Sequence, residues 1–264
     1  MAKTNRIYKN KDVLETKKYI KRRNEIITNR LLILFGLSVG VVSFFVYAMG
    51  ITWENIQKLK NITFAGLIVT GVLFILALVF FVYRIKKNID ESDKTVNSNN
   101  ILAVISFLLF SDFLIYFTSK TWIPFLTAFT ISLTLLVYIY YLYQKEFFLF
   151  SLFTGISCFL LYFAQSQAIS VYFRVCFIVL MAIFAAFITV FSLLLMKNKG
   201  NLKSKSININ ILEKKAKYFQ FYILAAFIAA LIVLNFFSIS FLYMICAILF
   251  YFVVTGIYFT VKMI

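Results

Sequence analysis

The stretch ITFAGLIVTGVLFILALVFFVY, from Ile62 to Tyr83, runs for 22 residues without a charged side chain. An α-helix rises about 1.5 Å per residue, and the hydrocarbon core of a bilayer is about 30 Å thick. A run of this length and polarity is long enough to cross a membrane as one helix. It therefore predicts a membrane-spanning helix over residues 62–83.

The composition of the whole chain agrees with this interpretation. Its 264 residues are 62% apolar and 14% charged, whereas soluble domains are roughly 45–50% apolar. Similar apolar runs recur along the sequence, and they predict an all-α, polytopic transmembrane helical bundle of about eight spans. The expected spans are residues 31–50, 62–83, 101–118, 125–143, 147–164, 169–196, 220–237 and 239–261.

Three boundaries between these spans depend on very short polar turns, at residues 144–146, 165–168 and 238–240. Apolar length alone therefore leaves six or seven spans open. The chain has one proline and eight glycines, which is low for membrane helices, where both residues are usually more frequent. This composition predicts long and mostly unbroken helices.

The lysines and arginines fall almost entirely on alternate connections. Of the 27 basic residues, 23 lie in residues 1–30, 84–100, 144–146, 197–219 and 262–264, 3 lie in the opposite connections, and Arg174 lies within a span. Basic residues accumulate on the cytoplasmic side of membrane proteins. The pattern predicts an even number of spans with both termini in the cytoplasm, in a bacterial-type cytoplasmic membrane.

Residues 1–30 form a basic segment ahead of the transmembrane domain, residues 31–264. On a helical wheel Val13, Ile20 and Ile27 form one stripe with basic side chains across from it. This pattern favours an amphipathic helix that lies on an anionic cytoplasmic leaflet, although a basic topology signal with little fixed structure explains the charges as well. The net charge of +17 is gathered in such segments, so we expect the lipid bilayer, and no nucleic acid, as the partner.

Two of the cytoplasmic connections are long. Residues 84–100 mix both signs of charge and end in Asn and Ser, which predicts a solvated, mobile linker. In residues 197–219 the alternation of Ile207, Ile209 and Ile211 predicts a short extended piece, followed by a helical entry into the next span.

Asp112, in the run FLLFSDFLIYF (107–117), is the one carboxylate within an expected span. A charge in hydrocarbon costs about 2.5–3.5 kcal/mol on insertion scales, so it needs a partner. With the predicted orientation, Asp112 and Arg174 lie at matching depths, roughly 9 and 7.5 Å below the same outer surface. Tyr116 shares the helix face of Asp112, Gln167 shares that of Arg174, and Asn235 lies at a similar level. We therefore predict an outer-leaflet polar cluster of these five residues.

Two interpretations of this cluster remain open. In the first, Asp112 and Arg174 form a salt bridge that fixes the register of the third and sixth spans, with Arg174 reaching towards the interface. In the second, the cluster binds a substrate or an ion, because intramembrane ionisable residues often mark pathways.

The residues present narrow the classes of function. The sequence has no histidine, and its three cysteines, Cys158, Cys176 and Cys246, lie in apolar runs without CxxC spacing, so we expect no metal site and no cofactor. An aspartyl mechanism needs two carboxylates that share a proton, which makes an enzyme the least favoured class. A non-catalytic scaffold or accessory subunit of a membrane complex, with other membrane subunits as partners, needs only what the sequence shows. A small transporter or lipid-moving protein that uses the outer cluster is the alternative.

Overall fold

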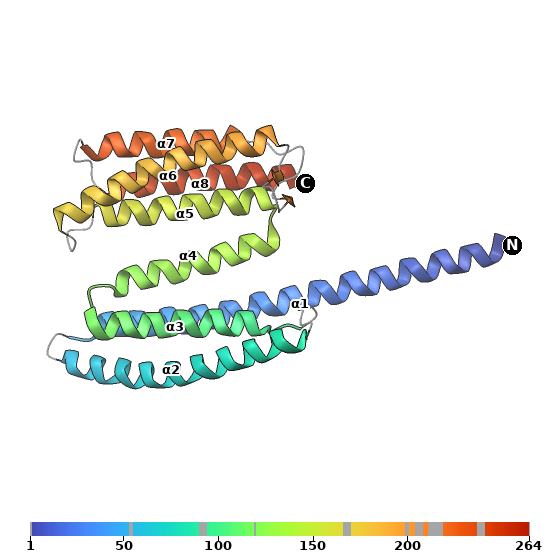
Figure 1. The fold of residues 1–264 in the computed structure, drawn as a ribbon, viewed down its shortest axis with the longest axis horizontal. Helices are drawn as coiled ribbons and strands as arrows, with labels where there is room; N and C mark the ends of the chain where they lie inside the picture. The colour runs from blue at the N-terminus through green and yellow to red at the C-terminus, as the bar shows by residue number, and fades with distance from the viewer. Residues whose placement is uncertain are drawn as a thin grey trace. The chain divides into compact units, whose positions relative to one another are not determined.

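The computed structural model describes residues 2–52, 55–89, 94–118, 120–165, 170–198, 201–203, 208–210, 219–236 and 241–263. Within these ranges the chain forms eight helices and one small antiparallel hairpin (Figure 1). Separate helices stand on both sides of each predicted turn, so the division into eight helical segments is confirmed. The helix α5 includes Lys145, Glu146 and Gln165, which were predicted as turn residues, and residues 166–168 and 238–240 lie outside the described part. The helices are α1 (Ala2–Gly50), α2 (Ile56–Lys87), α3 (Ser98–Thr118), α4 (Ile123–Leu142), α5 (Lys145–Gln165), α6 (Val171–Lys197), α7 (Phe219–Phe236) and α8 (Phe241–Met263).

Seven of the described helices are long and apolar enough to cross a bilayer, and α7 is shorter. Their outward faces carry large apolar side chains, such as Ile75 and Leu76 on α2, which are 62% and 60% exposed. Surface of this kind is stable against lipid and costly against water. The chain is a multi-pass helical membrane protein.

The chain divides into two compact units, Met1–Thr134 and Leu135–Ile264, with the boundary inside α4. In the first unit, α2 and α3 lie side by side as an antiparallel pair (Figure 1). Their contacts keep one register: the rings of Phe64 and Tyr116 are 5.7 Å apart at one end, and Arg84 bonds to Ser98 at the other. The second and third expected spans therefore form an antiparallel helical hairpin, which is in contact along its length.

An apolar cluster joins the four helices of the first unit near the turns α1–α2 and α3–α4. The ends of α1 and α3 meet the starts of α2 and α4 here, because adjacent helices run in opposite directions. The buried members of the cluster are Phe45, Ala48, Leu59, Ile115, Ile123 and Leu126.

The opposite end of the first unit is held by Arg30 of α1. Its Nε donates to the carbonyl oxygen of Thr95 at 3.1 Å, and its Nη2 donates to the carbonyl oxygen of Lys94 and to Oδ1 of Asn97 at 3.2 Å. A planar guanidinium suits such a task, because its donors form a fixed fork. Arg30 thus ties α1 to the segment that leads into α3.

Arg84, in the last turn of α2, makes a second connection at this end. Its Nη1 donates to Oγ of Ser98 at 2.7 Å and to Oδ1 of Asn99 at 2.8 Å, and Ser98 is buried. Within the predicted linker, residues 94–99 thus contact Arg30 and Arg84, while Lys94, Val96 and Asn99 are exposed as expected of a solvated segment. The Asn and Ser side chains and carbonyl groups of this segment are acceptors for the two arginines, and residues 90–93 lie outside the described part.

The helix α1 continues without interruption from Ala2 to Gly50 (Figure 1). The sequence explains the continuity, because no glycine or proline occurs before Gly36, and sharp kinks nearly always need such residues or an inserted group. A helix that lies on the leaflet has to bend where it enters the membrane. In the structure residues 2–30 extend the axis of the span by about 43 Å, and their position on an anionic leaflet stays a prediction.

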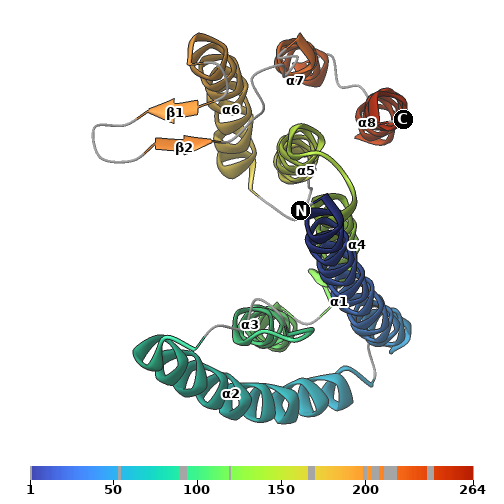
Figure 2. The same ribbon diagram turned by 90° about the vertical axis from the view of Figure 1, so that its right-hand side faces the viewer.

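In the second unit, α6, α7 and α8 are arranged around α5 (Figure 2). Phe147 of α5 is central to the packing, with its ring 5.6 Å from Phe252 and 5.3 Å from Phe259, both on α8. On the other side of α5, Phe153 meets Phe221 of α7 at 6.0 Å. Aromatic rings from α5, α7 and α8 therefore pack together in a core that also contains many aliphatic side chains.

A small hairpin lies between α6 and α7, with β1 (Asn201–Lys203) paired antiparallel to β2 (Asn208–Asn210). The strand β2 contains Ile209, so the predicted extended piece is present at that position. Ile207, Ile211 and the predicted helical entry over residues 211–218 lie outside the described residues.

Candidate functional site

The carboxylate of Asp112 is seated against α2. The hydroxyl of Thr70 lies 3.2 Å from Oδ2 of Asp112 and 2.8 Å from the carbonyl oxygen of Gly66, one turn earlier on its own helix. Its single proton is shared between these two acceptors. The half-buried carboxylate thus has a hydrogen-bond donor inside the helical hairpin.

Gly66 makes the room for this carboxylate. A Cβ at position 66 would lie 3.1 Å from Oδ2 and 3.3 Å from both Cγ and Oδ1 of Asp112, which is closer than ordinary contact. The neighbouring Gly71 is less confined, since a Cβ there would lie 3.9 Å from Leu109. The absence of a side chain at Gly66 therefore lets α3 bring Asp112 close to the α2 backbone, as small residues do in membrane helix pairs.

Tyr116 belongs to the same seam between α2 and α3. It lies one turn from Asp112 on α3, as expected from the sequence, and its ring packs 5.7 Å from that of Phe64 on α2. Sequence reasoning did not find Thr70 and Gly66 as the neighbours of Asp112. The signal was present in the small-residue pair Gly66 and Thr70, four residues apart in the middle of the preceding span.

The second unit has a polar contact of its own where α5 and α7 end. Nε2 of Gln165 donates to Oδ1 of Asn235 at 2.8 Å and lies 3.6 Å from Sδ of Met244 on α8. Asn235 was predicted as a site residue and Gln165 was not, because Gln165 was assigned to the turn after the fifth span. Gln167, which was predicted, lies outside the described residues.

Arg174 lies in the first turn of α6, at the same end of the second unit. Its Nε is buried and has no hydrogen-bond acceptor among the residues that the structure describes. The rings of Phe163 on α5 and Phe177 on α6 are stacked 5.0 Å apart. Since the two helices are antiparallel, Gln165 and Arg174 both lie beyond this ring pair, in one layer with Asn235.

The predicted outer cluster is thus distributed over two units. Asp112 and Tyr116 lie together in the first unit, and Arg174 and Asn235 lie at one end of the second. A direct pairing of Asp112 with Arg174 remains a prediction. The contacts that the structure adds are those of Asp112 with α2 and of Asn235 with Gln165.

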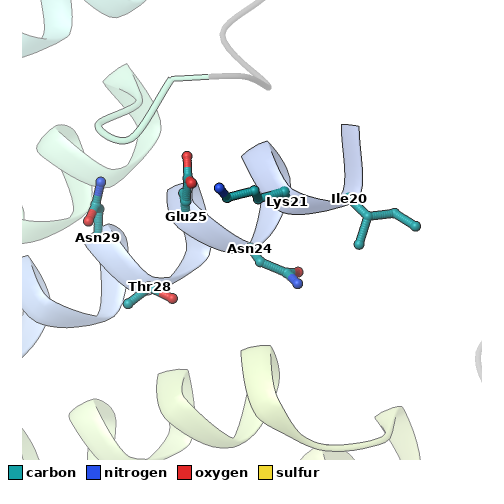
Figure 3. A pocket seen from close by; sticks show the side chains of 6 residues that line it. All are labelled: Ile20, Lys21, Asn24, Glu25, Thr28 and Asn29. Atoms are coloured by element: carbon teal, nitrogen blue, oxygen red, sulfur yellow. The ribbon is translucent and has the colours of Figure 1, made fainter. Parts of the chain in front are cut away.

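A surface hollow lies along the part of α1 that precedes the span (Figure 3). Its described lining comes from α1 alone, with Lys21, Glu25 and Asn29 on one side of the helix and Asn24 and Thr28 on another. A single helix face does not enclose a ligand, so we assign no site there. In the described part of the chain, no three His, Cys, Asp or Glu side chains lie close enough together to hold one metal ion.

No protein-family model, no curated protein and no solved structure matches the sequence or the fold of this chain.

Proposed function

We propose that the chain is a non-catalytic scaffold or accessory subunit of a membrane complex. The observation that carries this proposal is the environment of Asp112: its carboxylate fits beside Gly66 and accepts a hydrogen bond from Thr70. A carboxylate that is used to hold two helices together is a packing element. A transport site instead needs a group that exchanges its ligand with water.

Other polar side chains in the spans support the same interpretation. Hydroxyl groups on buried faces donate to the carbonyl oxygen four residues earlier on their own helix, which satisfies them without water. Examples occur in both units: Thr63, Ser111, Thr130, Ser151, Thr154, Ser157 and Ser192. These helices are built for static packing.

The proposed topology has eight spans, with both termini in the cytoplasm of a bacterial-type cell. The 18 residues of α7 are about 27 Å long, which is close to the thickness of the hydrocarbon core. Phe221, Leu224 and Ile228 of α7 are buried in the core of the second unit, so α7 packs as a full member of it. The basic residues on alternate connections support the orientation.

Two kinds of partner follow from this topology. The exposed apolar faces of the spans offer contact area to other membrane subunits as well as to lipid. Exposed basic residues of α1 that lie close to the bilayer, such as Arg22 and Arg23, favour an anionic cytoplasmic leaflet by about 1 kcal/mol each.

A second candidate function is a small transporter or lipid-moving protein. One observation favours it: the buried Nε of Arg174 has no acceptor among the described residues, and the amides of Gln165 and Asn235 lie in the same layer. A cation in this setting is suited to bind an anionic group.

Purification from gently solubilised membranes tests the proposal. The tagged wild-type chain and the variant Asp112→Asn should both retain the same companion protein at fixed stoichiometry, because Asn fits the same space and accepts the bond from Thr70. Two results together would contradict the proposal: isolation of the chain alone, and movement of a solute or lipid by that chain in vesicles that is lost in Asp112→Asn.

A further inference from the structure

We propose that Arg174, together with Gln165 and Asn235, forms a binding site for a phosphate group at the end of the second unit where α5 meets α6. This site is distinct from the contacts of Asp112 with Thr70 and Gly66, and the proposal does not depend on the scaffold function. Both a phospholipid headgroup and a soluble phosphate ester carry this chemistry. We favour the lipid, because the site lies near the end of membrane-spanning helices.

The placement follows from two contacts. Phe163 and Phe177 stack across the antiparallel helices α5 and α6. From this ring pair Gln165 lies about 3 Å and Arg174 about 4.5 Å closer to the same end, measured along their helices. The hydrogen bond from Gln165 to Asn235, 2.8 Å long, brings α7 into the layer. Three helices thus contribute one polar group each.

The buried Nε of Arg174 has no anionic partner among the described residues of the second unit. Residues 135–264 contain two carboxylate side chains, Glu146 and Glu213. Glu146 stands at the start of α5, about 28 Å along the helix from Gln165, and Glu213 lies outside the described residues. Since a buried charged donor without an acceptor is costly, an anion from outside the unit is the natural partner.

Phosphate suits the groups that are present. Arginine donates two parallel hydrogen bonds to phosphate oxygens, and the amide groups of Gln165 and Asn235 add neutral donors. Arg174 lies only about 4.5 Å along the axis from the first residue of α6, which places it near the level of lipid headgroups. Ser170, which precedes α6, makes no side-chain cap, so the positive end of the helix also favours a negative charge.

The competing anion is Asp112, the partner predicted from the sequence. In the first unit its carboxylate already bonds to Thr70 and fills the space beside Gly66. The two possibilities differ in their consequences: a phosphate site responds to added lipid, whereas a pair with Asp112 responds to Asp112→Asn.

The test uses the full chain in detergent, depleted of lipid, with its melting temperature measured as ligands are added. The probes are phosphatidylglycerol, a diacylglycerol with the same acyl chains but no phosphate, and soluble glycerol phosphate. Phosphatidylglycerol should raise the melting temperature of the wild type by several degrees, as ligands of the native state do, and diacylglycerol should not. Arg174→Gln should weaken the response at least tenfold, while Lys197→Gln, at the other end of α6, should respond like the wild type.

Each outcome decides the proposal. A response to glycerol phosphate that is as strong as the response to the lipid supports the site and assigns it to soluble phosphate esters. If Arg174→Gln does not fold, Arg174→Lys keeps the charge without the paired donors and should weaken the response severalfold. The proposal is overturned by a wild type that responds to no phosphate compound, by an unchanged response in Arg174→Gln or Arg174→Lys, or by loss of the response in Asp112→Asn.

Discussion

The hydroxyl of Thr70 on α2 lies 3.2 Å from the carboxylate of Asp112 on α3, directly beside a glycine that leaves space for it. This contact explains how a charged residue type is accommodated within a membrane span. The donor and the space both come from the preceding helix, so the hairpin of α2 and α3 supplies what Asp112 needs. Asp112 thereby helps to set the register between α2 and α3.

Substitution of Gly66 should disturb this contact. Gly66→Ala places a Cβ about 3.1 Å from the carboxylate, and such crowding typically costs about 1–3 kcal/mol. We expect a lower melting temperature in detergent, and recovery when Asp112→Ala is added. Gly71→Ala is the matched control, because its Cβ meets Leu109 at ordinary distance; equal losses in both variants would argue against a specific role for Gly66.

Arg84 should contribute to stability at the other end of the same hairpin. Arg84→Ala removes the hydrogen bonds to Ser98 and Asn99, and a hydrogen bond to a charged group is worth about 1.5–3 kcal/mol. Lys86→Ala, two residues later on the exposed surface, should change the stability by less than about 0.5 kcal/mol. Thermal unfolding of the two variants measures the difference, and indistinguishable curves would show that the Arg84 contacts are unimportant.

The topology predicts which positions face the outside of the cell. Single cysteines next to Trp53 or Lys120, in a chain without its native cysteines, should react with an impermeant thiol reagent added to intact cells. Cysteines next to Lys94 or Lys203 should react only after the cells are opened. External labelling near Lys203 would refute the proposed arrangement of spans, which rests on the basic residues of alternate connections.

The continuous helix α1 predicts that its N-terminal part leaves the membrane surface. In vesicles, a fluorophore at residue 10 should lie about 30 Å beyond residue 30 and should not be quenched by headgroup-attached quenchers. A fluorophore at residue 28 should be quenched. Strong quenching at residue 10, reversed by salt, would instead support the surface-lying amphipathic helix that the sequence suggests.

Apolar run lengths were sufficient to predict the number of helices, but not that α1 begins at Ala2. The segment 62–83 lies within α2, and the break between the fourth and fifth helices falls at residues 143–144, beside the predicted turn 144–146. Local hydrophobicity and length determine where a chain can span. Residues 94–99 were predicted less well. Their polarity indicated a solvated loop, but the arginines that bind them come from α1 and α2.

The neighbours of Asp112 could not be derived from depth alone. Depth along a helix gives the level of a residue but not its rotation or its neighbouring helix, and Arg174 was selected because its charge is opposite and its level matched. The hairpin register places Thr70 opposite Asp112, and that register follows from packing along the whole of α2 and α3. Gln165 was missed for a similar reason, because its contact with Asn235 joins helices 70 residues apart.

The most direct test of the central claim, that Asp112 is a packing residue in a scaffold, is a double-mutant cycle between Thr70 and Asp112 on thermal stability. Thr70→Val and Asp112→Ala should each destabilise the protein by about 1–3 kcal/mol, and the double variant should lose at least about 0.5 kcal/mol less than the sum. The conservative changes Thr70→Ser and Asp112→Asn should stay near the wild type and keep the companion protein. Additive losses would contradict the claim, because Thr70 and Asp112 would then not interact. An Asp112→Asn variant as defective as Asp112→Ala would also contradict it, because the negative charge itself would then be required.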